Sequence, residues 1–161
     1  MVNTLSSLLE RTISTELPEL RKITEDQAAS ALSNGAWSKK EELGHLIDSA
    51  TNNHVRFVRI TLEDGFKGPA YAQNDWVALH GYNEIPWSAI VNLWNQYNWL
   101  LVHLIAHIPE PRLQAEATIG SGTAVTLQFI IEDYVLHMRH HLDHILSRDK
   151  ITPYPGQSIG V

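Results

Sequence analysis

The sequence TLQFIIEDYVLHMRHHLDHIL, residues 126–146, decides the fold because it predicts one long helix carrying four of the protein's nine histidines. At about 100° per residue, His137 and His141 stand one turn apart on one face, in line with Ile130 and Tyr134. Two imidazoles at this spacing can hold one metal ion. The stretch therefore predicts a helical protein whose chemistry is built on the second half of its last helix.

The composition predicts one globular domain, and we expect residues 1–161 to form it. The chain is 43% hydrophobic and 19% charged, which is too apolar for a disordered chain and too interrupted for a membrane protein. The formal charge is −6 and the basic residues form no stripe that could neutralise phosphates, so we expect no nucleic-acid partner. The first ten residues lack the features of a signal peptide, and the expected compartment is the cytoplasm.

The absence of cysteine excludes disulfides, zinc fingers and iron–sulfur clusters, so any metal site must use His, Asp or Glu. A zincin would need H-E-x-x-H, but Met-Arg-His separates His137 from His141. A di-iron bundle needs two E-x-x-H motifs, and although Glu42 and His45 form one, the last helix has only Tyr134 at the matching position. Both of these metal sites are therefore excluded.

Apolar residues recur at helical spacing in three further segments, at about 4–23, 39–62 and 87–108. Pro18 is expected to kink or split the first segment, whereas Ser38 and Glu41 have the form of a capping box that starts the second. Together these features predict an all-α protein: a four-helix bundle with a long crossover loop between helices two and three and at most a short hairpin before helix four. We expect residues 147–161 to form a surface tail.

His45 is the candidate third ligand, because it lies in the first third of the second predicted helix with Asp48, Asn52 and Arg56 following on the same face. Two helices packed about 8–10 Å apart can bring one imidazole against two others. Three neutral imidazoles leave an open position on a divalent metal, which is the arrangement of catalytic zinc.

Carboxylates near these histidines in sequence are candidates to orient the ligand rings or to relay protons, namely Asp48, Asp133 and Glu132. Two other histidine pairs have the same four-residue spacing, His140 with His144 and His103 with His107, and the sequence assigns them no role. Such a pair is also compatible with histidines that are hydrogen-bonded in the core or simply exposed.

Four segments resemble the DinB-like superfamily: WSKKEELGHLID (37–48), NNHVRF (52–57), DWVALHGY (75–82) and DYVLHMRHH (133–141). Members of that superfamily are four-helix bundles that hold a divalent metal through three histidines, one on the second helix and two on the fourth. The resemblance implies His45, His137 and His141 as ligands of zinc or nickel. Relatives of this shape include bacillithiol S-transferases and mycothiol-dependent isomerases, which use the metal to activate a low-molecular-weight thiol.

We therefore expect a metal-dependent transferase or hydrolase that acts on a small molecule, with a low-molecular-weight thiol as candidate co-substrate. Asp48 is the candidate proton relay, and Asn52 and Arg56 are candidate substrate-binding residues. The alternative is a metal-binding stress-response or interaction protein whose site is not catalytic. Aromatic residues on different faces of the third predicted helix, Trp94 and the outward-facing Trp99, predict a homodimer.

Overall fold

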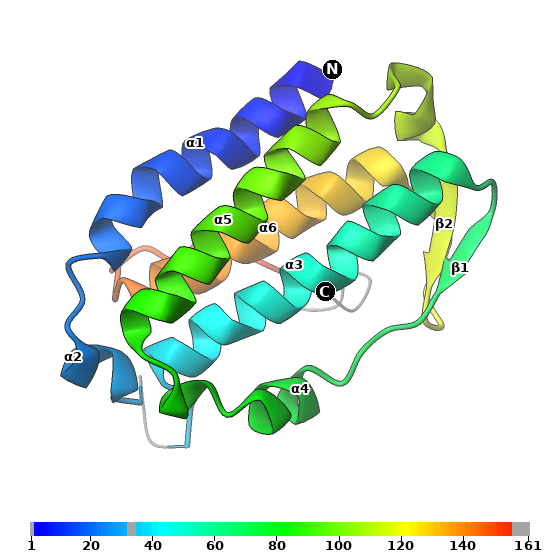
Figure 1. The fold of residues 1–161 in the computed structure, drawn as a ribbon. Coiled ribbons are helices and arrows are strands. Elements are labelled where there is room, and N and C mark those ends of the chain that lie inside the picture. Colours follow the sequence, from blue (N-terminus) through cyan, green and yellow to red (C-terminus); the bar gives the residue numbers. More distant parts are fainter. Residues whose placement is uncertain (1, 32–34, 156–161) are drawn as a thin grey trace.

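The computed structural model describes residues 2–31 and 35–155, and its long helices form a bundle (Figure 1). The four long helices are α1 (Val2–Leu20), α3 (Lys39–Leu62), α5 (Trp87–Ala106) and α6 (Leu127–Ile145). The connections contain two short α-helices and two 3-10 helices: α2 (Glu25–Ala29), α4 (Gln73–His80), η1 (Tyr82–Glu84) and η2 (Glu110–Gln114). The predicted four-helix bundle is confirmed. Residues 156–161 of the predicted tail lie outside the described residues.

The order of the helices around the bundle positions the histidines. Helix α3 packs against α5 and α6, and α1 packs against the same two helices. The colours in Figure 1 show that α3 and α5 run in the same direction, whereas α6 runs against α3. The connection 63–86 must therefore return along the 24 residues of α3, roughly 36 Å, before α5 begins. The antiparallel pairing of α3 with α6 places the first half of α3 beside the second half of α6.

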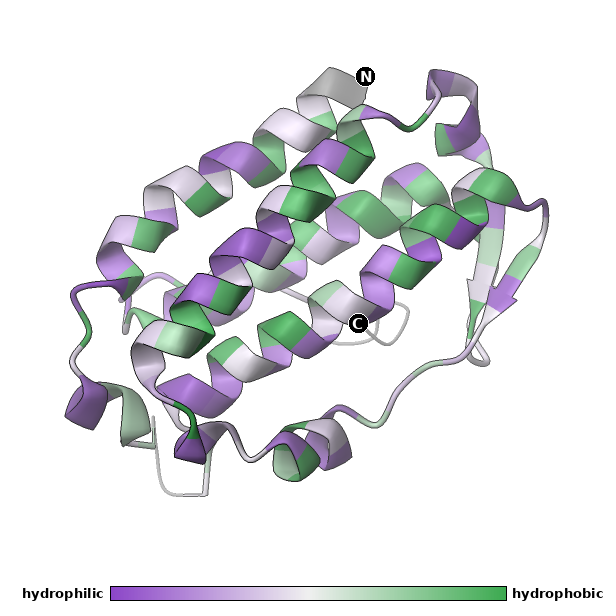
Figure 2. Ribbon diagram, viewed as in Figure 1, coloured by the Kyte–Doolittle hydropathy of each residue, from purple (hydrophilic) through white to green (hydrophobic). Residues whose placement is uncertain are grey.

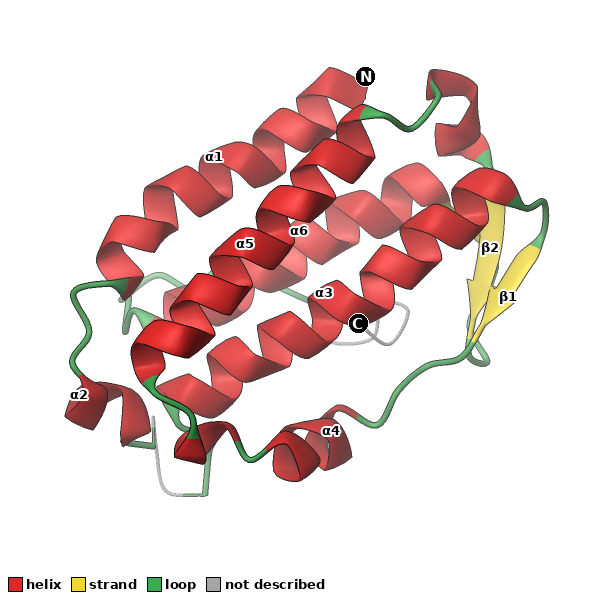
Figure 3. Cartoon of the chain, in the orientation of Figure 1, coloured by secondary structure: helices red, strands yellow, loops and turns green. Residues whose placement is uncertain are grey.

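A three-stranded sheet lies at one end of the bundle (Figure 3). Strand β1 (Phe66–Gly68) pairs in parallel with β2 (Glu116–Ile119), which pairs antiparallel with β3 (Val125–Thr126). The β2–β3 pair is the short hairpin that the sequence predicts. Strand β1 was not predicted, because three residues show no strand periodicity and their partner lies far along the chain.

The core lies between the long helices, along which hydrophobic and hydrophilic residues alternate (Figure 2). Leu46 and Trp94 are fully buried there. On α5, Trp99 is more exposed than the fully buried Trp94, in the order that the sequence predicts, although Trp99 still packs partly against the core. Leu93, which the helical pattern of 87–108 predicts to face inward, is instead 51% exposed. Leu93 shares its exposed face with Gln96 and Leu100, which lie about one and two turns further along α5.

The ends of the helices follow local chemistry. The capping box at the start of α3 is confirmed: Ser38 Oγ accepts the Glu41 N–H at 3.2 Å, and the Glu41 carboxylate accepts the Ser38 N–H at 2.8 Å. Helix α1 continues through Pro18, which lies in its last turn, to Leu20, so the predicted split does not occur. Among the described helices, none combines the length and apolar character needed to cross a membrane.

Candidate metal centre

Three imidazoles meet between α3 and α6, where His45 faces His137 and His141. The Nε2 atoms of His45 and His137 lie 3.1 Å apart, and the His141 ring centroid lies 4.8 Å from that of His45 and 4.5 Å from that of His137. One ring nitrogen of each residue lies within 4.8 Å of the other two. Zinc binds imidazole nitrogen at about 2.0–2.1 Å, so two nitrogens on one ion lie at most about 4.2 Å apart. The His45–His137 distance satisfies this limit, and the group can hold a metal ion.

Burial keeps two of these imidazoles neutral. His45 has no exposed surface and His137 is 3% exposed. Burial lowers the pKa of His45 to about 3, with a smaller contribution from the neighbouring His141. Burial is also the main cause that lowers the pKa of His137 well below its usual value. Both rings are therefore neutral at pH 7, which is the protonation state that binds a metal.

Glu42 fixes the outer side of His141. Its Oε1 lies 2.8 Å from His141 Nδ1 and 3.2 Å from His144 Nδ1, and the side chain is buried. A carboxylate at Nδ1 favours the tautomer with the proton on that nitrogen, which leaves the Nε2 lone pair for the triad. Sequence reasoning missed this role, although Glu42 lies one helical turn before His45 and so on the same face of α3.

The Nδ1 atoms of His45 and His137 are buried and have no hydrogen-bond partner among the residues that the structure describes. The carboxylates predicted to orient the ligands have other partners. Glu132 accepts a hydrogen bond from Gln128 at 2.9 Å, and Asp133 accepts one from the Tyr154 hydroxyl at 3.2 Å.

Asp48 joins α3 to the connection that contains α4 and η1. Its Oδ1 accepts the Tyr82 hydroxyl at 2.6 Å and lies 3.0 Å from His80 Nδ1, whereas its Oδ2 is buried with no partner in the described part of the chain. Burial raises the pKa of Asp48, and the contacts with Tyr82 and His80 oppose that shift. The Tyr82 ring reaches Asp48 because it lies directly on Gly44, where an added Cβ would stand 2.2 Å from the ring.

Asn52 and Arg56 both line a cavity of about 240 Å³ between α3, β1 and the residues before α4. The Asn52 amide donates to the Asp48 carbonyl of its own helix at 2.9 Å. Arg56 is 3% exposed and donates to the Pro69 carbonyl at 3.3 Å. Burial lowers the pKa of Arg56. The two candidate substrate-binding residues thus share one cavity.

Two aromatic rings cover the triad. The Trp37 ring centroid lies 5.1 Å from that of His45, and the Tyr154 centroid lies 5.2 Å from that of His137. Tyr154 belongs to the segment 147–155 that follows α6, so this segment packs over the histidines. The triad is thus covered by one residue that precedes α3, Trp37, and one that follows α6, Tyr154.

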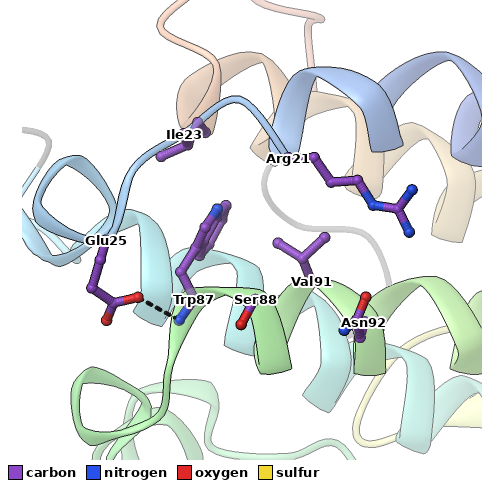
Figure 4. Close-up of a pocket in the computed structure, with 7 residues that line it drawn as sticks. All are labelled: Arg21, Ile23, Glu25, Trp87, Ser88, Val91 and Asn92. Atoms are coloured by element: carbon purple, nitrogen blue, oxygen red, sulfur yellow. Dashed lines mark hydrogen bonds between the residues drawn. The ribbon is translucent and has the colours of Figure 1, made fainter.

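Another cavity, of about 250 Å³, lies between the end of α1 and the start of α5 (Figure 4). The Glu25 carboxylate accepts the Trp87 backbone N–H there at 2.8 Å and also binds Lys40. The hydrogen bond from Lys40, together with that from Trp87, lowers the pKa of Glu25. This cluster holds α2, α3 and α5 together and contains no histidine.

No protein-family model matches the chain. The chain is 25% identical over 110 residues to a protein of Halalkalibacterium halodurans named "Putative metal-dependent hydrolase". The match covers 68% of this chain and 64% of that protein, so it spans less than two thirds of the relative.

Two solved structures have a similar fold. YfiT from Bacillus subtilis, described as a probable metal-dependent hydrolase with an unusual four-helix bundle topology, has a TM-score of 0.78 at 23% identity over 91% of this chain and 86% of its own. The mycothiol-dependent maleylpyruvate isomerase has a TM-score of 0.74 at 13% identity over 90% of this chain and 60% of its own. Because both structures are below 25% identical to this chain, these likenesses bear out the resemblance at the level of the fold.

Proposed function

We propose that the protein is a divalent-metal-dependent transferase or hydrolase that acts on a small molecule, with His45, His137 and His141 as the metal ligands. The observation that carries this proposal is a set of three imidazoles, two of them buried, with no carboxylate among them. Neutral ligands leave a bound zinc or nickel ion its full charge, so that it acts as a Lewis acid and activates a bound nucleophile. The names of the Halalkalibacterium relative and of YfiT support metal-dependent hydrolysis.

The chain's own residues would then supply orientation and proton transfer. Glu42 holds His141 through Nδ1, so the ring presents its other nitrogen to the triad. Asp48 relays protons, because its carboxyl group is buried while His80, bonded to the same carboxylate, is 45% exposed to solvent. Arg56 and Asn52 bind a carboxylate of the substrate in the cavity that they line.

The proposed co-substrate is a low-molecular-weight thiol. The chain has no cysteine, so a thiolate nucleophile must come from a separate molecule. The likeness to the mycothiol-dependent isomerase supports this choice. A thiolate would be attracted by the full charge of a dication, and the burial of His45 and His137 reduces the screening of that charge, which favours a thiolate over a neutral ligand.

Cobalt substitution tests the proposal. We expect protein purified without added metal to contain zinc or nickel near one equivalent, and the cobalt form to develop a sulfur-to-metal charge-transfer band when a small thiol is added at neutral pH. His137→Ala should lose both the tightly bound metal and the band. A spectral change with hydroxide but with no thiol would reject thiol activation and leave hydrolysis by metal-bound water. Failure of zinc, nickel and cobalt all to bind would reject the metal-dependent function.

The alternative function is a metal-binding interaction protein with a sealed site. The burial of His45 and His137 beneath Trp37 and Tyr154 favours this alternative. The cobalt spectrum separates the two functions, because a sealed site binds cobalt but responds to neither thiol nor hydroxide.

We also propose that the protein is a homodimer. Leu93 and Leu100, which lie two turns apart on α5, are 51% and 48% exposed. A second copy would remove both from water. Light scattering at micromolar concentration tests this proposal, and a monomer would contradict it.

A further inference from the structure

His141 belongs to two groups of metal-binding side chains. Besides the triad, Glu42, His141 and His144 each offer one ligand atom, and these atoms lie within 4.8 Å of one another. Glu42 Oε1 lies 2.8 Å from His141 Nδ1 and 3.2 Å from His144 Nδ1. His141 thus presents Nδ1 to this second group, which leaves Nε2 for the triad.

The second group is nearer to solvent than the triad. His45 and His137 are almost fully buried, whereas the side chains of His141 and His144 are 17% and 37% exposed. Glu42 and His144 also line a cavity of about 540 Å³ beside Trp37 and the residues that follow α6. An ion that arrives by this cavity meets the second group before it reaches the triad.

The charges around the second group favour a weak cation site. Glu42 supplies the negative charge that the triad lacks. Lys39 acts against a bound cation, because its ammonium group interacts with Glu42 while it donates to Ser147 Oγ at 3.0 Å. Arg148 lines the same cavity, but its guanidinium is held by Glu16 at 2.6 Å. The carboxylate therefore attracts a cation, and the neighbouring ammonium limits the affinity.

We propose that Glu42, His141 and His144 form an outer cation site through which a divalent metal is loaded into the triad. Two histidines and one carboxylate are a recognised ligand set for zinc. This inference rests on the proposed function, because a triad that binds no metal needs no loading site. It assigns His144 a role that differs from that of the triad residues.

The two ring nitrogens of His141 explain why the sites are used in turn. A neutral imidazole carries one N–H, so binding a cation at Nδ1 requires the proton on Nε2, and binding at Nε2 requires it on Nδ1. As the cation moves inward, the proton passes from Nε2 to Nδ1 through solvent. The new Nδ1–H of His141 then donates to the Glu42 carboxylate, so that a hydrogen bond replaces the cation at that carboxylate.

The experiment separates the outer site from the triad with cobalt(II) and zinc as probes on the full-length, metal-free protein. His45→Ala removes the triad and should still bind one cobalt ion, with an affinity lower than that of the wild type by at least about 100-fold, or roughly 2.7 kcal/mol. His45→Ala combined with His144→Ala should bind none. The matched control combines His45→Ala with His140→Ala. It should keep the weak ion, because His140 Nδ1 faces the Thr152 carbonyl at 2.8 Å and lies outside both groups.

The single variant His144→Ala tests the loading role. We expect it to slow zinc uptake about tenfold while the equilibrium affinity stays within about twofold of the wild type, because it lacks a transient ligand and keeps the triad. Uptake at the wild-type rate would overturn the loading role.

Other outcomes overturn the site itself. If folded His45→Ala binds no cobalt while the wild type binds one ion, Glu42 is only a hydrogen-bond partner of His141. If His45→Ala combined with His144→Ala still binds the weak cobalt ion, His144 is not a ligand and the outer site is also rejected. A wild type that binds no metal rejects the proposed function, which is a distinct result. Circular dichroism checks folding, and His137→Ala provides a second variant without the triad.

Discussion

The pair His103 and His107 on α5 and the pair His137 and His141 on α6 have the same H-x-x-x-H spacing but different surroundings. His103 and His107 are exposed, and His107 Nδ1 lies 2.7 Å from the His103 carbonyl, at the C-terminal cap of its own helix. Neither residue belongs to a group that could hold a metal among the residues that the structure describes. His137 and His141 meet His45 across the bundle. Spacing on one helix therefore gives two rings a common face, and only a facing helix adds the third.

Burial is the second difference between the two pairs. The α6 pair lies where the first half of α3 passes antiparallel to the second half of α6, and the Tyr154 ring packs on His137. Removal from water penalises the imidazolium form, so His45 and His137 are kept neutral. The α5 pair stands at a helix end in contact with solvent.

The largest expected effect is on metal affinity. His137→Ala should weaken zinc binding more than about 100-fold, because it removes a ligand and not a residue that merely orients one. The matched control, His107→Ala, should leave the affinity unchanged. Titration of metal-free protein with zinc or cobalt measures both. Equal losses in the two variants would erase the distinction between the pairs.

The second expected effect concerns stability and pH in the metal-free protein. The pKa of His45 is about 3 in the folded state and about 6.5 when unfolded, so the unfolded state binds more protons between these values. The free energy of unfolding should therefore fall as the pH drops below about 6.5, by about 2 kcal/mol at pH 5 from His45 alone. Urea unfolding at pH 7 and pH 5 measures this loss. In His45→Gln the loss should be smaller than in the wild type by the contribution of His45. A variant with the parent's pH dependence would contradict the burial argument, and His103→Gln is the exposed control.

A smaller effect is expected from the cover over the α6 pair. Tyr154→Ala removes the ring that packs on His137 and should lower the free energy of unfolding by about 1 kcal/mol. It should also speed the removal of metal by a chelator, because the ligand becomes more accessible to water. Tyr154→Phe keeps the ring and loses the hydroxyl contact with Asp133. Chelator kinetics that are the same for Tyr154→Ala and the wild type would show that Tyr154 does not shield the site.

The smallest effect is expected at the α5 pair. His107→Ala removes only an exposed hydrogen bond at a helix end, so the free energy of unfolding should change by less than about 0.5 kcal/mol. Thermal or urea unfolding measures this change. A loss above about 1.5 kcal/mol would mean that the exposed pair has a structural role comparable to that of the buried one.

The sequence by itself determined the four long helices and the shared face of His137 and His141, but it did not predict the short helices α2 and α4. The predicted range 39–62 is that of α3, and the predicted 126–146 differs from α6 by one residue at each end. These features are local, because helical period and capping depend on residues within a turn or two of each other. The same period predicted that His137 and His141 share a face and that His45 shares one with Asp48, Asn52 and Arg56. Metal binding by these residues remains a prediction.

Only the tertiary structure decided what each face meets. The contact of Glu42 with His141, the packing of Tyr154 on His137 and the pairing of Phe66 with Ala117 join residues that are distant in the chain or on separate elements. A periodic pattern predicts that one face of a helix is buried, but it does not predict which element packs against that face. The neighbour depends on the order and direction of the helices, and here the parallel course of α3 and α5 leaves α6 to run against α3. That arrangement brings His45 against His137. The pair His103 and His107 has the same spacing as His137 and His141 but remains exposed to solvent.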